Sequence, residues 1–168
     1  MPALAHLGIG FAIKRFAPQI PLWALLISSM LLDGLSFIFL YALWITHGLF
    51  MSIVWSILAL GMTTLITIGL NLKKGKDKKA YSELLSIGFI IGLVVFSHWI
   101  LDFIGWPMSV IDPASTGVPI LFDDAVNIGL GVYSTWFGAL LMDLGMFAVG
   151  ILVFIHYQLK IKKYKIKQ

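Results

Sequence analysis

Five ionisable residues stand within or beside long apolar stretches of the sequence, where such side chains are costly in lipid and usually functional. They are His6, Asp33, His47, His98 and Asp102. His98 and Asp102 are four residues apart, a spacing that places two side chains on one face of a helix with their Cβ atoms ~5–6 Å apart. This pair could bind one metal ion, and it could equally form a hydrogen bond that lines a polar seam between helices.

The residue types at these five positions favour a divalent metal. The sequence contains no cysteine, so a thiolate site is excluded and His and Asp remain as ligands. Carboxylate oxygens and neutral imidazoles suit Zn²⁺, and a buried pair of carboxylates is unfavourable unless a cation neutralises it. A bound ion could also turn a water molecule into a nucleophile near neutral pH. We therefore expect a site for one or two metal ions, with zinc as the expected metal.

The composition indicates that these residues are held by membrane helices. Of 168 residues, 60% are hydrophobic and 12% are charged, whereas roughly a quarter of residues are charged in a soluble domain. Because a membrane helix needs about 20 apolar residues, four spans are predicted, at 20–45, 49–72, 84–104 and 129–157. A shorter apolar segment, 3–17, is predicted to form an additional helix inside the bundle. The predicted fold class is an all-α polytopic membrane bundle, with residues 1–168 forming one domain.

The basic residues predict how this bundle is oriented. All twelve Lys and Arg residues lie in three short segments next to apolar runs: Lys14–Arg15, Lys73 to Lys79, and Lys160 to Lys167. Short loops rich in Lys and Arg stay cytoplasmic, so this pattern predicts a multi-pass protein of the cell (inner) membrane with a basic cytoplasmic tail, 158–168. Segment 105–128, which has no Lys or Arg, is then an outer loop. The same placement favours contact with anionic lipid over binding to nucleic acid.

This topology brings the five candidate ligands to one depth. At 1.5 Å per residue, His98 lies ~22 Å and Asp102 ~28 Å from the cytoplasmic start of their helix, and Asp33 lies ~18 Å along its own. His47 falls in the turn that opens the next span, and His6 precedes Lys14 by two helical turns. Separate segments therefore contribute ionisable groups to the outer half of the membrane.

The same residues resemble a known family, the membrane-bound metal-dependent hydrolases of bacteria and archaea, which are related to the zinc-dependent phospholipase C and single-strand nuclease superfamily. The similarity rests on His6-Leu-Gly-Ile-Gly, on Asp33 fourteen residues before His47 of a Thr-His pair, and on His98-x3-Asp102. The segment Ser115-Thr-Gly-Val-Pro-Ile120 also resembles the stretch that follows the His-x3-Asp helix in this family.

The resemblance implies a catalytic role for the site. It implies that Asp33, His47, His98 and Asp102 surround one zinc ion, and that Asp102 bridges to a second ion held with His6. Asp33 would act as general base for a water that attacks phosphorus. The implied activity is phospholipase C-like hydrolysis of a phosphoester in a lipid or lipid-linked substrate at the outer leaflet, with membrane lipids as partners.

Two other functions remain open at this point. A protein that binds or transports divalent cations would need a polar path leading inward from the site, for which span 49–72 offers only hydroxyl groups. A non-catalytic membrane protein with a structural metal site is the third reading. It is favoured by the lack of the further histidines that bind a third metal in the soluble enzymes, since only His156 follows.

Three further acidic residues have no single interpretation from sequence. Asp143, inside the last span, could be an additional ligand, could orient a histidine, or could form a hydrogen bond between helices. Asp123 and Asp124 of the outer loop are expected to face water, with contact to substrate or metal as the alternative.

The topology can be tested with single cysteines, because the natural chain has none. Cysteine at Lys76 or Lys165 should react with a thiol reagent only after the membrane is made permeable, whereas cysteine at Asp112 should react in intact cells. Labelling of positions 76 and 112 from the same side would contradict the predicted orientation.

Overall fold

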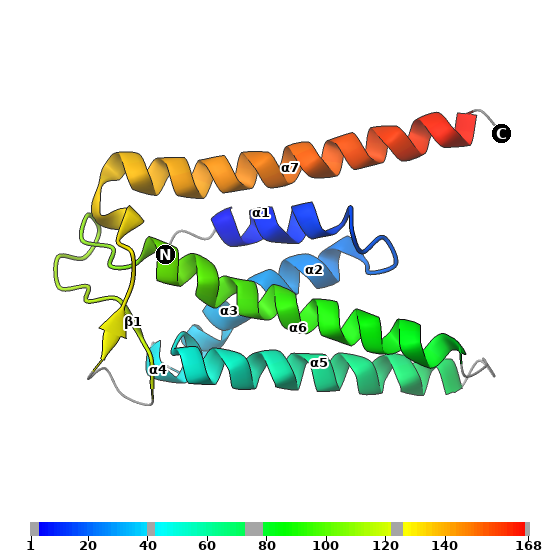
Figure 1. Cartoon of the computed structure of the whole chain (residues 1–168), viewed down its shortest axis with the longest axis horizontal. Coiled ribbons are helices and arrows are strands. Elements are labelled where there is room, and N and C mark those ends of the chain that lie inside the picture. Colours follow the sequence, from blue (N-terminus) through cyan, green and yellow to red (C-terminus); the bar gives the residue numbers. More distant parts are fainter. Residues whose placement is uncertain (1–3, 40–42, 73–78, 122–125, 167–168) are drawn as a thin grey trace.

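The computed structural model describes residues 4–39, 43–72, 79–121 and 126–166, and these residues are mainly helical. In order, the helices are α1 (Leu4–Ile13), α2 (Leu22–Ser29), α3 (Leu31–Ile38), α4 (Leu43–Thr46), α5 (Leu49–Leu72), α6 (Lys79–Gly105) and α7 (Trp136–Ile166). Two short strands, β1 (Val118–Pro119) and β2 (Asn127–Ile128), and a 3₁₀ turn, η1 (Val132–Ser134), lie between α6 and α7. Figure 1 shows α5, α6 and α7 running along the long axis of the molecule.

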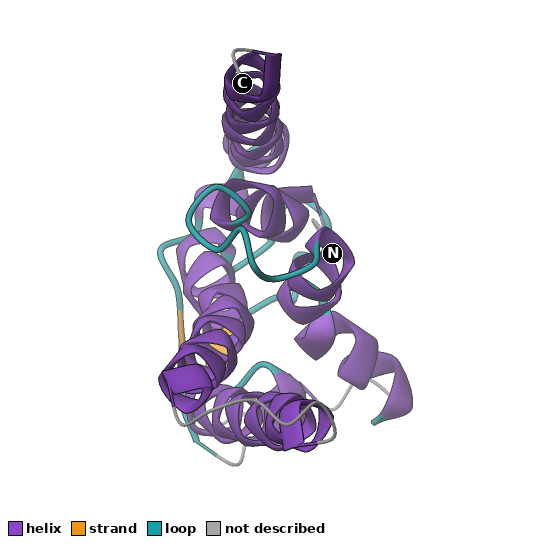
Figure 2. Ribbon diagram, turned by 90° about the vertical axis from the view of Figure 1, so that its right-hand side faces the viewer, coloured by secondary structure: helices purple, strands orange, loops and turns teal. Residues whose placement is uncertain are grey.

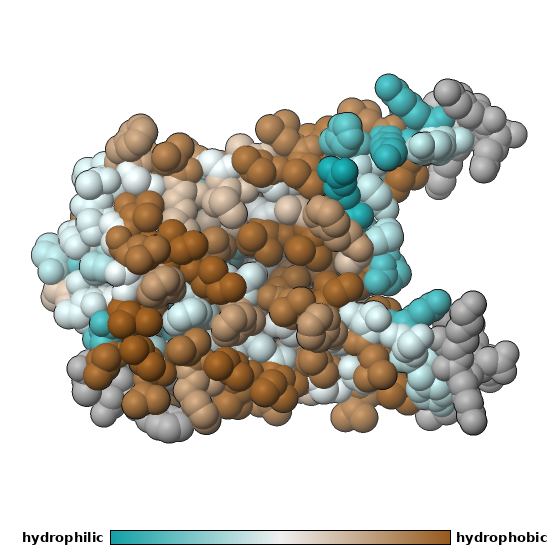
Figure 3. Space-filling model, in the orientation of Figure 1, coloured by the Kyte–Doolittle hydropathy of each residue, from teal (hydrophilic) through white to brown (hydrophobic). Residues whose placement is uncertain are grey.

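Three helices are long and apolar enough to cross a membrane, and their apolar parts are Leu49–Asn71, Tyr81–Gly105 and Trp136–Tyr164. Large apolar side chains are exposed along all three, for example Leu65, Phe89 and Leu152 at 71%, 56% and 64%. Figure 3 shows hydrophobic residues covering most of the middle of the face in view. An apolar surface of this extent requires lipid as its solvent, so the chain is a helical membrane protein, as predicted.

The prediction of a fourth long helix at 20–45 is not confirmed. Instead, α2 and α3 are eight residues each and meet at Met30, whose φ of −106° and ψ of 7° depart from helical values. The hydroxyls of Ser28 and Ser29 donate to the carbonyls of Ala24 and Leu26, at 2.7 and 2.9 Å. Such bonds from Ser to its own helix compete with the helical pattern and bend the chain. The apolar composition of this segment concealed the break.

The other predicted helices are found with shifted ends, and the short helix predicted at 3–17 ends at Ile13. Helix α5 coincides with the predicted span, while α6 begins five residues before residue 84. Helix α7 begins at Trp136 rather than 129, because the chain first forms β2 and then turns at Gly131 with a φ of 70°. It also continues to Ile166, so most of the predicted tail 158–168 is helical.

Small residues let the helices approach closely. Helix α1 lies between α7 and the α2–α6 pair (Figures 1 and 2), and the backbones of Gly8 and Gly150 are in direct contact. A Cβ atom at Gly150 would collide with the carbonyl oxygen of Gly8. Between α5 and α6, a Cβ at Gly88 would lie 2.8 Å from the Leu60 carbonyl oxygen, and one at Gly92 would lie 3.0 Å from that of Ser56. This use of glycine is typical of membrane helix packing.

The segment after α6 covers one end of the bundle. Strands β1 and β2 pair antiparallel, with Val118 opposite Ile128, and the Phe50 amide of α5 donates to the Ile120 carbonyl at 3.3 Å. A buried cluster beneath this segment joins it to α1, α6 and α7; its members are Ala5, Leu101, Trp106, Met108, Val118, Tyr133 and Met142. Trp106 belongs to this core, with 6% of its surface exposed.

Described basic residues gather at the opposite end of the bundle. Lys14 and Arg15 follow α1, and Lys160, Lys162 and Lys163 lie in the last turns of α7. Figure 3 shows strongly hydrophilic residues at this end, beyond the apolar middle. The molecule is therefore polarised along its long axis, as the sequence predicted. Which end faces the cytoplasm stays a prediction.

Candidate metal centre

The five candidate ligands lie together in the interior. His6 comes from α1, Asp33 from α3, His47 from the turn between α4 and α5, and His98 and Asp102 from α6. Their exposed fractions are 3%, 6%, 0%, 1% and 3%, in that order. Four segments that are far apart in sequence therefore meet at one buried point.

Four of the five side chains form a closely spaced set of donor atoms. The His47 Nε2 atom lies 3.4 Å from Asp33 Oδ1 and 3.6 Å from Asp102 Oδ2. The His98 Nε2 atom lies 3.6 and 3.5 Å from the same two oxygens. Hydrogen bonds between nitrogen and oxygen are usually ~2.7–3.2 Å long. Neighbouring donors of a tetrahedral ion are about 3.3–3.6 Å apart when each bond is ~2.0–2.2 Å, and the observed distances match that spacing.

The converging atoms have no hydrogen-bond partner within the described part of the chain. They include both carboxylate oxygens of Asp33, one oxygen of Asp102, and the Nε2 atoms of His47 and His98. Buried polar atoms in proteins almost always have a partner. Several unpaired atoms that face one another therefore indicate that a further group belongs between them.

The other ring nitrogen of two histidines is held in place. His98 Nδ1 lies 2.8 Å from the Ser29 carbonyl oxygen, which can only accept, so Nδ1 carries the proton. His47 Nδ1 contacts the hydroxyl oxygens of Thr46 and Ser36 at 2.7 and 3.2 Å. Such bonds fix the orientation of a ligating imidazole and leave the opposite nitrogen free to bind a metal. The Nε2 atom of His98 is thus available for an ion in the neutral ring.

His6 extends the set on its other side. Its ring stacks on that of His98 with centroids 3.7 Å apart and an interplanar angle of 2°, and its Nε2 lies 3.5 Å from Asp102 Oδ1. Because Asp102 faces His6 with Oδ1 and the other two histidines with Oδ2, its carboxylate lies between two groups of donors.

Two overlapping triads in the described residues could hold a metal ion. One is His6, His98 and Asp102, and the other is Asp33, His47 and His98. Both are fully buried. The structure thus brings together all five residues that sequence reasoning selected, and their His and Asp donors are suited to a divalent transition metal.

Sequence reasoning missed the residues that orient these donors. Ser29 ends α2 next to the break at Met30, where the last helical carbonyls lack partners in their own helix, and one of them accepts from His98. Ser36 donates to the Leu32 carbonyl at 3.1 Å and contacts Thr46 as well as His47. In the sequence, Ser36 lies three positions after Asp33, and Thr46 lies directly before His47. This closeness could have indicated residues that orient the ligands, but only the fold shows that both hydroxyls contact His47.

Tyr133 lies near the centre, in the cover over the bundle. Its side chain is 2% exposed and packs against Gly105 at the end of α6. Burial raises the pKa of the Tyr133 phenol, and the charges of Asp143 and Asp102 raise it further. Tyr133 is therefore a neutral phenol close to two carboxylates.

Asp143 holds the start of helix α1 in place. Its Oδ1 accepts a hydrogen bond from the Ala5 backbone amide at 2.8 Å. A carboxylate at the first turn of a helix satisfies a free amide and complements the helix dipole. Asp143 thus anchors the start of α1 immediately before His6, in agreement with the hydrogen bond between helices considered from sequence. Asp123 and Asp124 lie outside the described residues.

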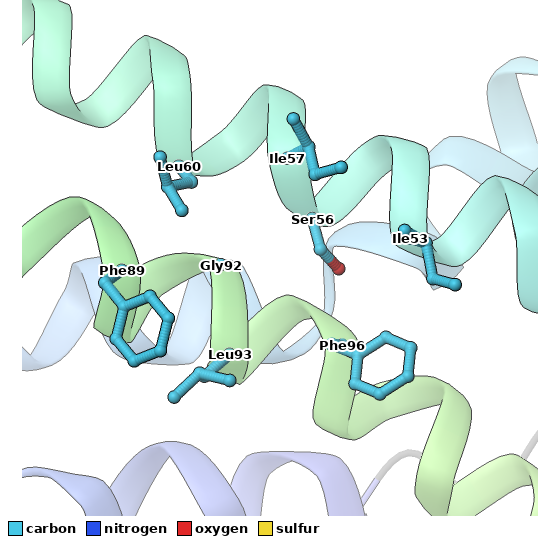
Figure 4. Close-up of a pocket in the computed structure, with 8 residues that line it drawn as sticks. All are labelled: Ile53, Ser56, Ile57, Leu60, Phe89, Gly92, Leu93 and Phe96. Atoms are coloured by element: carbon cyan, nitrogen blue, oxygen red, sulfur yellow. The ribbon is translucent and has the colours of Figure 1, made fainter.

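An apolar groove of about 240 Å³ lies between α5 and α6 (Figure 4). It is lined by Ile53, Ser56, Ile57, Leu60, Phe89, Gly92, Leu93 and Phe96. None of the five candidate ligands borders it. It opens on the lipid-facing side of α6, where Leu93 is 52% exposed.

Comparison with protein-family models, with curated proteins and with solved structures gives no match to this chain. The resemblance to membrane-bound hydrolases therefore stays a prediction, and the site has to be interpreted from its own geometry.

The anchoring role of Asp143 predicts a graded mutational effect. Asp143→Ala leaves the Ala5 amide without an acceptor and should lower the free energy of unfolding by about 1–3 kcal/mol. Asp143→Asn retains an oxygen acceptor and should lose less than half as much. Thermal unfolding of purified protein in detergent measures both. Equal losses for the two variants would show that the charge, rather than the hydrogen bond, holds α1.

Proposed function

We propose that this chain is a metal-dependent membrane hydrolase that holds one or two zinc ions and cleaves a phosphoester of a lipid or lipid-linked substrate at the outer leaflet. The observation that carries the proposal is the convergence of unpaired Asp oxygens and His Nε2 atoms at 3.4–3.6 Å. The residue motifs shared with membrane-bound hydrolases agree with it.

A cation accounts for the cluster better than ion pairs between protonated histidines and carboxylates. Charge-assisted hydrogen bonds close to about 2.7–2.9 Å, whereas every His–Asp distance in the cluster is at least 3.4 Å. Two carboxylates with 6% and 3% exposure are also costly without a compensating charge. One or two divalent ions between the donors would remove both difficulties.

The spacing suggests how the ligands are divided. Asp33, His47, His98 and Asp102 would hold one ion, with the Oδ2 atom of Asp102 facing it. The Oδ1 atom of Asp102 and the Nε2 atom of His6 would contribute to a second ion. The hydrogen bond from His98 to Ser29 would keep that ring in the ligating tautomer.

Bound zinc would supply a water of lowered pKa and positive charge to stabilise a phosphate. The chain would supply the base. Asp33 faces the Nε2 atoms of His47 and His98 with Oδ1, and its Oδ2 has no hydrogen-bond partner in the described chain. Asp33 could therefore bind metal with one oxygen and accept a proton from water with the other.

The surroundings favour a lipid substrate. Described Lys and Arg side chains lie at the opposite end of the molecule, so a phosphate would be attracted by the metal ions themselves. The centre lies inside an apolar bundle near the end covered by the β1–β2 segment, and a lipid could reach it from the side. With the basic end toward the cytoplasm, the chain would be a multi-pass inner-membrane protein with a cytoplasmic C-terminus.

One observation favours a second candidate, a non-catalytic metal site. All five residues are at most 6% exposed, which suits a structural ion as well as a closed active site. Transport has less support. In α5, the Ser56 and Thr67 hydroxyls donate to carbonyls of their own helix, at 2.6 Å to Ser52 and 2.8 Å to Thr63, and these bonds do not extend the site inward.

Metal content tests the site itself. We expect one to two zinc ions per purified chain by elemental mass spectrometry, and loss of most of them in His98→Ala and Asp102→Ala. Asp102→Ala should affect both ions because its two oxygens face different donor groups. Asp112→Ala is the matched control, since Asp112 is an exposed loop carboxylate and should leave zinc unchanged. Full occupancy in Asp102→Ala would remove the proposed site.

Catalysis is tested by Asp33→Asn, which keeps one oxygen ligand and removes the basic charge. Because general bases contribute ~10²–10⁴-fold, this variant should lose most phosphoesterase activity and retain appreciable zinc. The assay is release of phosphate or phospho-alcohol from lipid phosphoesters in liposomes, with added zinc and with a chelator. If the zinc-loaded parent cleaves no member of a broad lipid panel, the metal site is structural and not catalytic. Zinc flux across the vesicle membrane would instead indicate a carrier.

A further inference from the structure

A basic cleft lies at the end of the molecule opposite the metal centre. It is formed where the turn after α1 meets the last turns of α7, and its volume is about 280 Å³. Its lining residues are Arg15, His156, Tyr157, Lys160, Ile161 and Tyr164. A second hollow of about 390 Å³ shares His156 and Lys160 and adds Leu159 and Lys163. Figure 3 shows hydrophilic residues around the recess beneath the projecting end of α7.

The length of α7 places this cleft at the membrane surface. The helix has 31 residues and is ~46 Å long, whereas the hydrocarbon core is ~30 Å thick and is crossed by about 20 residues. Counted from Trp136, the core ends near His156. Lys160 and Lys163 then lie among lipid headgroups, together with two tyrosines of the kind that concentrate at membrane interfaces.

The turn that carries Arg15 is fixed by its own hydrogen bonds. The Lys14 ammonium donates to the carbonyls of Pro18 and Ile20, at 2.8 and 2.6 Å. The Arg15 guanidinium carbon lies 5.7 Å from the centre of the Phe16 ring, and that ring is 72% exposed. With Phe16 directed into lipid, Arg15 is held at the border between lipid and water. Its guanidinium could bind a phosphate through two parallel hydrogen bonds.

No protein carboxylate neutralises the cleft among the described residues. All ion pairs among the described residues lie in the candidate metal centre, where they join a histidine to Asp33 or Asp102. Arg15, Lys160 and Lys163 are exposed and form no ion pair with the described residues, so they are accessible to an external anion. The anion that is always present at this depth is the phosphate of a membrane lipid.

We infer that Arg15 and the His156–Lys160–Lys163 face of α7 form a binding site for the headgroup of an anionic phospholipid of the leaflet at the basic end. The lipid phosphate lies between Arg15 and Lys160, and the acyl chains continue along α7 beside Leu159 and Leu152. This lipid links α7 to α1 at the end of the bundle that the loop segment does not cover. The site is independent of the metal centre and of its proposed activity.

Native mass spectrometry of the full chain in detergent tests the site, with equimolar phosphatidylglycerol and phosphatidylcholine as probes. We expect preferential retention of phosphatidylglycerol. Arg15→Gln and Lys160→Gln should each weaken its apparent Kd about fivefold, as expected for one surface charge. Lys162→Gln is the matched control, because Lys162 belongs to the same turns of α7 but lines neither hollow, and it should change the Kd by less than twofold. Unchanged melting temperatures should confirm that these exposed substitutions leave the fold intact.

Three outcomes would overturn the inference. Equal retention of phosphatidylcholine would remove the preference for an anionic headgroup. An equal loss in Lys162→Gln would show only a general charge effect. Binding of millimolar inorganic phosphate to the chain, without retained phosphatidylglycerol, would assign the cleft to a soluble anion.

Discussion

The burial of two carboxylates and three imidazoles at one point between apolar helices is the constraint on which the rest of the structure depends. Six side-chain atoms of this cluster are buried without a hydrogen-bond partner in the described chain. Each such atom costs about 1–3 kcal/mol, and charged groups cost more. Since a folded protein is stable by only ~5–15 kcal/mol, the cluster needs a compensating group. A divalent cation is the simplest one that matches these donors.

The helices around the cluster are shaped to deliver and orient the donors. The break at Met30 divides an apolar segment into α2 and α3, so that Ser29 can accept from His98 while Asp33 faces the same point from the following helix. The short turn between α4 and α5 presents His47, with Thr46 beside its ring. Irregular backbone inside a membrane protein is tolerated where the freed polar groups find partners, and here His98 of the candidate metal centre is such a partner.

Helix α7 contributes no ligand but determines where one of them lies. The close contact between Gly8 and Gly150 lets α1 enter the bundle next to α7, and Asp143 accepts from the first turn of α1. His6 follows one residue later and stacks on His98. A helix of only ten residues is too short to cross a membrane alone, so its position depends on this support. At the other end of α7, the basic cleft forms the proposed lipid-headgroup site at the membrane surface, well away from the buried centre.

The sequence by itself determined the solvent of this protein, its long helices and the identity of the candidate ligands. A chain with 60% hydrophobic residues cannot cover its surface with polar groups, and ionisable residues in such a chain are few enough to be conspicuous. The spacing of His98 and Asp102 also fixed their shared helix face. The prediction of one long helix over 20–45 was wrong because hydropathy reports apolar length but not backbone continuity. Only the tertiary structure decided that Ser29, Ser36 and Thr46 orient the histidines and that Asp143 holds α1. Those contacts join residues up to 138 positions apart, and their geometry depends on how the helices pack, which no local pattern encodes.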